Sequence, residues 1–231
     1  MVTPPPERIL PERPTLDFEG PFWRSGFSGV AGVDEVGRGA LAGPLVAAAV
    51  VLPVSLGAAG TRLRKALAGV RDSKLMTAAQ RVEMAKRIRD SAVGWSVDAV
   101  TADELDRVGV TAANRIAMER AVAGLANPVA ALLLDARVIE ADVPQVGLIK
   151  GDRRSLSVAC AAILAKVHRD ALMVAHHERD GRYAFAAHKG YGTPDHLSAL
   201  TRHGPCDLHR RSFQWPGNET FAVPDGLAAK E

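Results

Sequence analysis

The sequence predicts an α/β fold, in which a mixed central sheet is flanked by helices and the C-terminal portion is helical. Two observations support this prediction. Short apolar runs bounded by turn residues come first in the chain, and longer segments with helical spacing of apolar residues alternate with further short runs after them. The 231 residues, 47% hydrophobic and 24% charged, suffice for one globular domain with a sizeable core.

Two apolar runs near the N-terminus predict neighbouring buried strands. Residues 29–33 lead into Asp34, and residues 44–52 follow after a short loop. Further short apolar runs predict three more strands, over residues 95–100, 129–134 and 146–150. Asp135 directly follows one of them, and ligands of open α/β sheets bind at the carboxyl ends of strands, so Asp135 is a candidate site residue.

Helical periodicity accounts for much of the remaining chain. Thr77 and Gln80 have the spacing of a capping box, which predicts a helix through about residue 92. Three further helices are expected, over residues 111–125, from Ser155 to about residue 176, and from about Thr193. The acidic stretch at residues 103–106 is expected to be a solvated turn.

The two ends of the chain are rich in proline and glycine. We expect a largely disordered N-terminal tail over residues 1–27, one folded domain over residues 28–215 and a C-terminal tail over residues 216–231. The N-terminus lacks a secretion signal, and no apolar run approaches the roughly 20 residues that cross a bilayer. Two scattered cysteines make no disulfide framework. A cytoplasmic location without membrane contact is the resulting expectation.

Four carboxylates stand at the ends of predicted elements: Asp34, Glu35, Asp135 and Asp152. A buried charge without a partner costs on the order of several kcal/mol, so a cation must compensate acids beside the core. Arg38 could form a plain salt bridge, although that would need only one carboxylate. Four gathered carboxylates repel one another and are stable mainly with divalent cations, and oxygen ligands favour Mg²⁺ or Mn²⁺ over zinc.

Asp34 and Glu35 are adjacent, so a regular strand would point them to opposite faces. Both reach one site only if the backbone departs from regular pleating there. Gly37 and Gly39 permit that departure, because glycine enters backbone regions closed to other residues. The residues alone place metal or phosphate chemistry slightly ahead of a plain turn.

Basic residues are concentrated between Arg62 and Asp90. Nine Lys and Arg residues stand there against three acids, whereas the whole chain carries a net charge of only +3. The local excess of positive charge fits a phosphate-facing surface or a solvated helix face, and the sequence leaves both interpretations open.

Other motifs carry weaker signals. His203, Cys206 and His209 have ligand-like spacing, yet structural zinc takes four ligands and no fourth stands nearby in the sequence, so a zinc site is the less favoured interpretation. The glycines of residues 37–43 miss the dinucleotide-binding spacing by one residue, and the chain has no phosphate-loop motif. These absences argue against a nicotinamide enzyme or a nucleoside triphosphatase.

Taken together, the motifs resemble those of bacterial type 2 ribonuclease H (ribonuclease HII), which cleaves RNA in RNA–DNA hybrids. The matching segments occur in family order: residues 32–39 with 41–44, 72–74, 134–135, 150–152, 163–167 with 169–170, 188–191 and 210–213. They span nearly the whole chain between the two tails. Two departures from the common pattern are Ala40, in place of a proline, and Ala162, in place of a serine. We expect them to loosen a turn and to remove one hydroxyl contact.

The resemblance implies a ribonuclease H-like fold in which Asp34, Glu35, Asp135 and Asp152 are catalytic and bind two Mn²⁺ or Mg²⁺ ions. It also implies that Gly37, Arg38 and Gly39 read the ribonucleotide at the cleavage point, and that Tyr191 packs against the sugar of the following deoxynucleotide. Three lysines are candidate phosphate contacts: Lys74, Lys150 and Lys166.

The reaction implied by the resemblance is endonucleolytic hydrolysis of the RNA strand of hybrids, with cutting 5′ of single ribonucleotides in duplex DNA. Two ions about 4 Å apart would activate water and leave 5′-phosphate and 3′-hydroxyl ends. Such nucleic acids are the expected partners, a monomer is the expected state, and removal of ribonucleotides or primer remnants from DNA is the implied role. The alternatives are a resolvase-like nuclease of the same broad fold and a hybrid-binding protein without catalysis.

Overall fold

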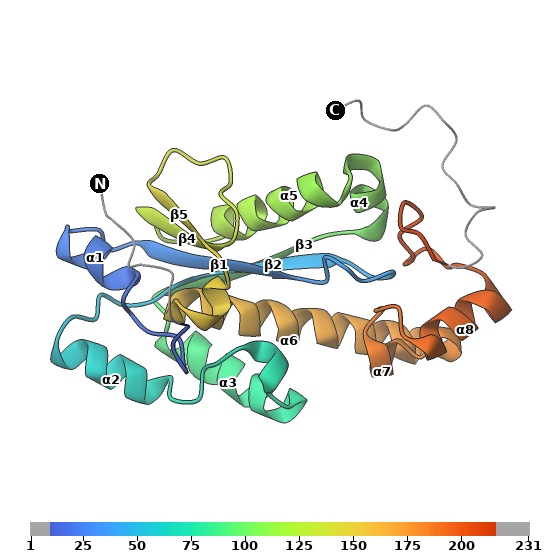
Figure 1. Cartoon of the computed structure of the whole chain (residues 1–231), viewed down its shortest axis with the longest axis horizontal. Helices are drawn as coiled ribbons and strands as arrows, with labels where there is room; N and C mark the ends of the chain where they lie inside the picture. The colour runs from blue at the N-terminus through green and yellow to red at the C-terminus, as the bar shows by residue number, and fades with distance from the viewer. Residues whose placement is uncertain (1–9, 216–231) are drawn as a thin grey trace.

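The central element is a five-stranded sheet with helices on both faces, as seen in a computed structural model that describes residues 10–215 (Figure 1). The strands are β1 (Val30–Val36), β2 (Leu45–Val51), β3 (Gly94–Val100), β4 (Ala131–Asp135) and β5 (Gln145–Leu148). Their order is β3-β2-β1-β4-β5. Strands β1 to β3 pair antiparallel, whereas β4 is parallel to both β1 and β5. The predicted mixed sheet is therefore confirmed.

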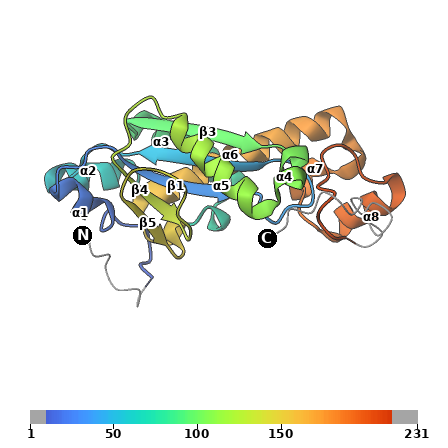
Figure 2. The ribbon, with the colours of Figure 1, turned by 90° about the horizontal axis from the view of Figure 1, so that it is seen from above.

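Helices cover the two faces unequally. The helices are α1 (Glu19–Arg24), α2 (Ala58–Ala66), α3 (Ala78–Ser91), α4 (Ala102–Val108), α5 (Val110–Ala123), α6 (Leu156–Arg179), α7 (Phe185–His188) and α8 (Pro194–His203). The long helix α6 crosses one face, with α2 and α3 beside it, and α5 crosses the other face (Figure 2). Within residues 10–215, no helix has the length and apolarity to cross a membrane.

Strand alternation divides the core into two layers. Val30 of β1 belongs to the cluster on the α6 face, together with Ile163 and Leu164 of α6. Ala31 and Val33 belong to the cluster on the α5 face. All residues of β2 are buried because both faces of this strand are covered, which explains why the strand reads as an unbroken apolar run.

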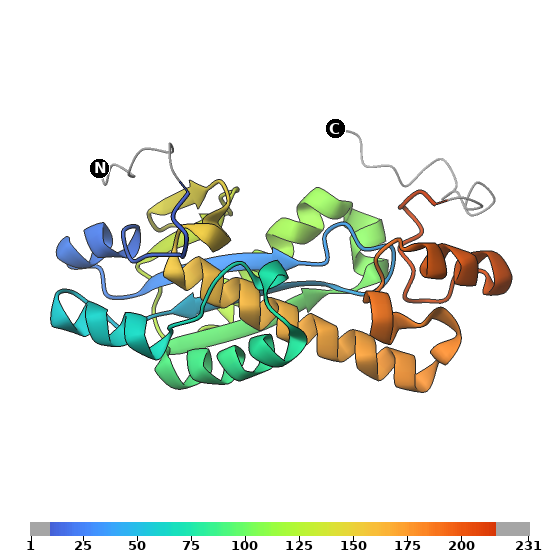
Figure 3. The ribbon, with the colours of Figure 1, turned by 60° about the horizontal axis from the view of Figure 1, so that its bottom comes forward.

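The C-terminal residues form a small helical module at the far end of α6. Helices α7 and α8 lie beyond the end of the sheet, joined to α6 by the 3-10 turn Gly181–Tyr183 (Figure 3). Tyr183 and Phe185 stack in the centre of this module against Met173 of α6. The prediction of a helical C-terminal portion is confirmed.

Local signals placed most of the elements correctly. The capping box at α3 is present, with the Gln80 amide donating to Thr77 Oγ1 at 3.2 Å and the Thr77 amide donating to Gln80 Oε1 at 3.0 Å. The expected solvated turn at residues 103–106 is wrong, because these residues lie in α4. Thr101 caps that helix, and its Leu105 is fully buried.

The expected disordered tail over residues 1–27 is wrong for residues 10–27. Phe22 and Trp23 of α1 are buried in the α6-face core, and the Thr15 amide donates to the Arg154 carbonyl at 3.0 Å. The proline content concealed a segment in which Leu16, Phe18, Phe22 and Trp23 are buried in the core. Residues 1–9 and the expected tail over residues 216–231 lie outside the described residues.

A buried carboxylate attaches α1 to the start of α6. Glu19 Oε1 accepts hydrogen bonds from the hydroxyls of Ser155 and Ser157 at 2.6 and 2.7 Å, and from the Ser157 amide at 2.9 Å. Ser155 is also the N-cap of α6. The helix that follows the Asp152 turn is thus held in place by the segment that the sequence assigned to a tail.

Candidate active site

Parallel pairing of β1 with β4 brings Asp34 and Asp135 together. The β1–β4 register aligns Val33 with Leu134, so the next pair is Asp34 beside Asp135. Both side chains follow the alternation that points Val30 and Leu133 toward α6, and so they share a face. Asp152 joins them from the 3-10 turn Gly151–Arg153, immediately before α6.

Glu35 reaches the same site without any irregularity of the strand. Glu35 pairs with Ala47 of β2 in continuous antiparallel register, so the expected departure from regular pleating is wrong. Its neighbour β4 ends at Asp135, one residue short of Glu35. Glu35 lines the cavity at the point where β4 ends beside β1.

A cavity of about 420 Å³ joins these groups. Its lining comprises Asp34, Glu35, Val36, Ser73, Lys74, Asp135, Asp152, Ala162, Lys166 and Tyr191. The four acids that the sequence singled out therefore converge, together with Tyr191 and two of the three candidate lysines. Lys150 does not line this cavity; its side chain is exposed just before the Asp152 turn.

The electrostatics of the cavity favour a bound cation. Burial first, and then repulsion from the other three acids, raises the pKa of Asp34 well above its ordinary value. Burial and the charge of Asp135 raise the pKa of Glu35, although Arg38 opposes that rise. Burial also raises the pKa values of Asp135 and Asp152, even though the Gly151 amide donates to Asp135 Oδ1 at 2.7 Å.

The donor set fits a hard divalent cation. All four side chains offer oxygen, and Glu35 Oε2 is buried with no hydrogen-bond partner in the described part of the chain. Among residues 10–215, no three acids, histidines or cysteines are already close enough together to hold an ion. Mutual repulsion of the carboxylates opposes closer approach, and a divalent charge would remove that repulsion.

The glycine-arginine-glycine loop is a tight turn next to Val36. The Ala40 amide donates to the Gly37 carbonyl at 3.2 Å, a bond that a proline at this position could not make. Gly37 has a φ of +91°, and an added Cβ would lie 2.2 Å from Arg169 Nε. At Gly39 an added Cβ would meet nothing within 4 Å. The turn thus leaves the Gly39 backbone and the Arg38 side chain exposed to a ligand.

Two buried arginines support this turn, and sequence analysis did not assign them a role. Arg169 of α6 donates to the carbonyls of Pro44, Ala42 and Lys189 at 2.8, 3.0 and 2.9 Å. Arg210 donates to the Gly43 carbonyl at 2.9 and 3.1 Å and to the Arg38 carbonyl at 3.0 Å. Both are fully buried. Both lie in segments that match the family, but their acceptors are backbone carbonyls, whose positions cannot be predicted from the sequence.

The Tyr191 ring lies against two positively charged side chains. Arg169 stands 5.3 Å and Lys166 Nζ 5.8 Å from the centre of the Tyr191 ring. Lys166 also forms an ion pair of 2.7 Å with Asp170, which in turn contacts Arg81 at 3.5 Å. Asp170 therefore holds Lys166 beside the ring.

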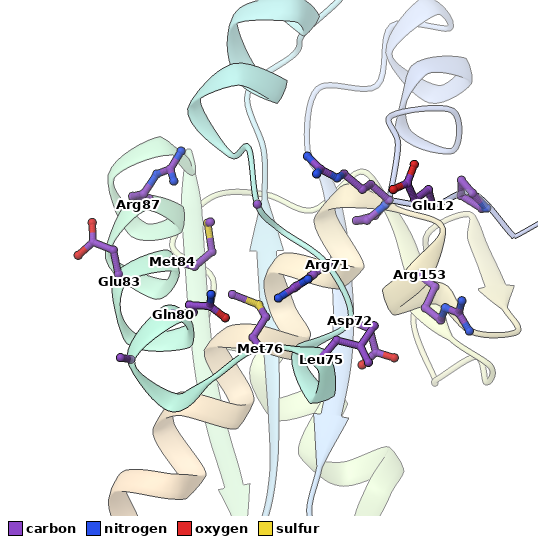
Figure 4. Close-up of a pocket in the computed structure, with 15 residues that line it drawn as sticks. Glu12, Arg71, Asp72, Leu75, Met76, Gln80, Glu83, Met84, Arg87 and Arg153 are labelled. Carbon is purple, nitrogen blue, oxygen red and sulfur yellow. The ribbon is translucent and has the colours of Figure 1, made fainter.

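A second cavity, of about 630 Å³, has a separate lining (Figure 4). Arg71, Asp72 and Arg153 face it together with Met76 and Met84. It contains none of the four acids, so the choice of the candidate site rests on chemistry and not on size.

Two arginines of the basic stretch between Arg62 and Asp90 form hydrogen bonds to backbone carbonyls within the protein. Arg81 donates to the Ser73 and Met76 carbonyls, and Arg87 donates to the Ala66 and Ala68 carbonyls. These bonds link the ends of helices and loops. Lys74 is the member of the basic stretch that reaches the acid cavity.

The His203-Cys206-His209 motif does not converge on one point. His209 Nδ1 lies 3.2 Å from Cys206 Sγ, whereas the His203 ring packs edge-on against Tyr183 with centroids 6.1 Å apart. Metal-holding groups of three such side chains are absent from the part of the chain that the structure describes.

Comparisons with known proteins find relatives both by sequence and by structure. The family profile described as Ribonuclease HII matches residues 31–215. The chain is 46% identical to the Ribonuclease HII of Pelotomaculum thermopropionicum, over 85% of this chain and 72% of that protein. It is 48% identical to the Ribonuclease HII of Herpetosiphon aurantiacus, over 85% and 93% respectively. The crystal structure of ribonuclease H2 from Pyrococcus horikoshii superposes with a TM-score of 0.68 at 25% identity, covering 83% of this chain and 96% of that one.

Proposed function

The chain belongs to the ribonuclease HII family, and from that premise we propose that its acid cavity cuts duplex DNA on the 5′ side of a single embedded ribonucleotide. Enzymes of this family are nucleases that hydrolyse the RNA strand of RNA–DNA hybrids endonucleolytically, and the chain is such a ribonuclease H. The observation that supports the finer proposal is the presence of Tyr191 in the same cavity as the four acids.

Asp34, Glu35, Asp135 and Asp152 are proposed as the residues that hold two Mn²⁺ or Mg²⁺ ions. Such ions supply an activated water and stabilise the leaving 3′-oxygen of a phosphodiester. The protein's contribution is to hold four oxygen donors in a largely buried cavity and to fix Asp135 through the Gly151 amide. Burial raises the pKa of each acid, and a bound cation would favour their ionised forms.

Gly37, Arg38 and Gly39 are proposed to recognise the ribonucleotide. A 2′-hydroxyl is the local group that distinguishes RNA from DNA, and an open backbone turn offers it donors and acceptors. The space around Gly39 supports this role, because no protein atom occupies the position of a side chain there. The Tyr191 ring would then pack against the flat sugar of the following deoxynucleotide, which lacks the hydroxyl.

Two lysines of the cavity are proposed to contact phosphates. Lys74 and Lys166 line the acid cavity, and the Lys74 amide is fixed by Asp72 at 3.0 Å. Lys150 is a weaker candidate, because its side chain stands outside the cavity lining.

The proposal is tested by cleavage of three labelled duplexes in the presence of Mn²⁺ or Mg²⁺. We expect cutting of an RNA–DNA hybrid and of a duplex with one ribonucleotide, no cutting of an all-DNA duplex, and no cutting when a chelator is present. Equal cutting of all-DNA would favour a resolvase-like nuclease, and metal-dependent binding without cutting would favour a hybrid-binding protein. Cutting of the hybrid alone would refute the single-ribonucleotide proposal.

A further inference from the structure

Three histidine rings stand directly behind Tyr191, in a cluster formed by His188, His196 and His209. His196 is fully buried and His209 is 2% exposed. The His188 and His196 rings stack with centroids 4.4 Å apart, and the His209 ring lies 5.2 Å from that of His196. None of them lines the acid cavity.

The hydrogen bonds of His209 determine which nitrogen carries its proton. The Cys206 amide donates to His209 Nδ1 at 2.9 Å, closer than the Cys206 carbonyl oxygen, which lies 3.3 Å from the same nitrogen. An amide N–H can only donate, so Nδ1 must present a lone pair. The proton of the neutral His209 ring is therefore on Nε2.

The same reasoning extends to His196 and from there to Tyr191. His209 Nε2 and His196 Nε2 are 3.0 Å apart, and since the former carries a proton the latter must accept it. The proton of His196 is then on Nδ1, which lies 3.0 Å from the Tyr191 carbonyl oxygen. A chain of hydrogen bonds with a single direction runs from the Cys206 amide through both rings to the Tyr191 backbone.

His188 supports the residue before Tyr191 in a similar way. The Gly190 amide donates to His188 Nδ1 at 3.2 Å, so His188 Nε2 carries the proton and donates to the Tyr183 carbonyl at 2.7 Å. The Tyr191 amide donates to the His188 carbonyl at 3.0 Å. The backbone on both sides of Tyr191 is thus fixed by the cluster.

We propose that His196 and His209 are positioning residues for substrate recognition, which act by holding the Tyr191 backbone so that its ring stays in the acid cavity. The proposal rests on the proposed role of Tyr191 toward the deoxynucleotide sugar. Neither histidine touches the substrate or the reacting atoms, and both act through the Tyr191 carbonyl. Main-chain bonds also hold this segment: the Leu41 and Ala42 amides donate to the Gly190 carbonyl at 2.8 and 3.2 Å, and the Thr193 amide donates to the Tyr191 carbonyl at 2.8 Å. The histidine chain adds the side-chain contact to the Tyr191 carbonyl.

The arrangement holds only while the rings are neutral. A second proton on any ring would set two N–H groups against each other. The clash would lie at the Cys206 amide for His209, between the two Nε2 atoms for His196, and at the Gly190 amide for His188. The ionisable groups that face the cluster are His177, Tyr183, Lys189, Asp195, Cys206 and Arg211. Burial lowers the pKa of all three rings, that of His209 to about 4, which agrees with the neutral forms that the geometry requires.

A direct test reads the tautomers by nitrogen NMR of the full chain with isotope-labelled histidine, near neutral pH. We expect His196 with its proton on Nδ1, the less common neutral tautomer, and His188 and His209 with theirs on Nε2. The signals are assigned by single His→Gln variants. A charged His196 or His209, or a His196 proton on Nε2, would overturn the proposal.

A kinetic test uses pairs of variants that differ in hydrogen bonding at one position. His196→Leu and His209→Leu should raise KM for a single-ribonucleotide duplex by about tenfold, a loss of about 1.4 kcal/mol, with a smaller change in kcat. His196→Asn can still donate to the Tyr191 carbonyl, and His209→Gln can still donate to His196, so both should recover most of the affinity. The exposed His203→Leu, in the same module, should match wild type.

Equal KM values for the Leu variants and their Asn or Gln counterparts, with all variants folded by circular dichroism, would contradict the positioning role. Tyr191→Ala separates this failure from failure of the proposed function. If Tyr191→Ala cleaves normally, the assignment of Tyr191 to the sugar is wrong, and the positioning proposal falls with it whatever the NMR result. If Tyr191→Ala loses affinity while the Leu variants do not, only the histidine proposal is wrong.

Discussion

Asp34 is the acid whose charge is most disfavoured by its surroundings. Its side chain is only 6% exposed to solvent, and three other carboxylates repel it. Its folded-state pKa is raised above the unfolded value of about 3.9, so its contribution to stability is complete below that pH and is lost as pH rises through the folded pKa. At neutral pH the charged Asp34 therefore destabilises the protein unless a cation compensates it.

Because the Asp34 charge is unfavourable without a cation, Asp34→Asn should stabilise the metal-free protein and should remove its stabilisation by metal ions. In chelator at neutral pH, the variant should unfold about 2–4 °C above wild type, which corresponds to about 1 kcal/mol. Added Mn²⁺ should raise the melting temperature of wild type but not of the variant. The exposed Asp142→Asn serves as the matched control. An Asp34→Asn variant that Mn²⁺ stabilises as strongly as wild type would contradict the assignment.

The two glycines of the recognition turn should behave differently when each is replaced by alanine. Gly37→Ala adds a Cβ in a left-handed conformation, 2.2 Å from Arg169 Nε, and should cost about 1–3 kcal/mol of unfolding free energy in urea denaturation. Gly39→Ala meets no protein atom and should leave stability unchanged, while raising KM for a single-ribonucleotide duplex. Normal KM for Gly39→Ala would argue against close approach of the substrate to this backbone.

At the level of elements, α1 depends on one buried carboxylate. Glu19→Ala removes the acceptor of three hydrogen bonds at the start of α6 and should lower the free energy of unfolding by about 2–4 kcal/mol, measured by urea denaturation. The exposed Glu12→Ala, from the same segment, is the control and should be neutral. Equal stability of the two variants would show that α1 contributes little to the fold.

The C-terminal module should be sensitive to acid through its histidines. His209 has a pKa lowered to about 4 by burial, whereas in the unfolded chain it titrates at about 6.5. The unfolded state then binds more protons between these values, so stability is complete above about pH 6.5 and falls as pH drops toward about 4. The melting temperature of His209→Gln should decline less over this interval. An identical decline would mean that His209 does not titrate on unfolding.

Elements with a local signal were predictable from the sequence, and those without one were not. Strands β1, β2 and β4 are recognisable from their apolar runs, and α3 is recognisable from its capping box. Helix α1 lacks such a signal, because its Phe22 and Trp23 follow a proline-rich stretch and form a helix only by packing on the core. Helix α4 was hidden by its acidic residues, since only Ala102 and Leu105 mark its buried side.

For the molecule as a whole, the acids could be predicted from the sequence but the scaffold that supports them could not. Four carboxylates at element ends predicted a shared site; sheet pairing brings Asp34 beside Asp135, and the turn before α6 adds Asp152. How Glu35 joins them depends on where β4 ends, which is a property of the register between distant segments. Arg169 and Arg210 join the turn, α6 and the C-terminal module through carbonyl groups, and carbonyl positions follow only from the folded backbone.

The four acids are proposed to act together on a strand that contains a ribonucleotide. This proposal is tested most directly by mapping the products of a duplex with one ribonucleotide after single-turnover reaction with wild type, Asp135→Asn and the Asp142→Asn control, in Mn²⁺. We predict one cut on the 5′ side of the ribonucleotide by wild type and control, leaving 5′-phosphate and 3′-hydroxyl ends, and a loss of at least about a thousandfold in rate for Asp135→Asn. Full activity of Asp135→Asn, or cutting at sites unrelated to the ribonucleotide, would contradict the account.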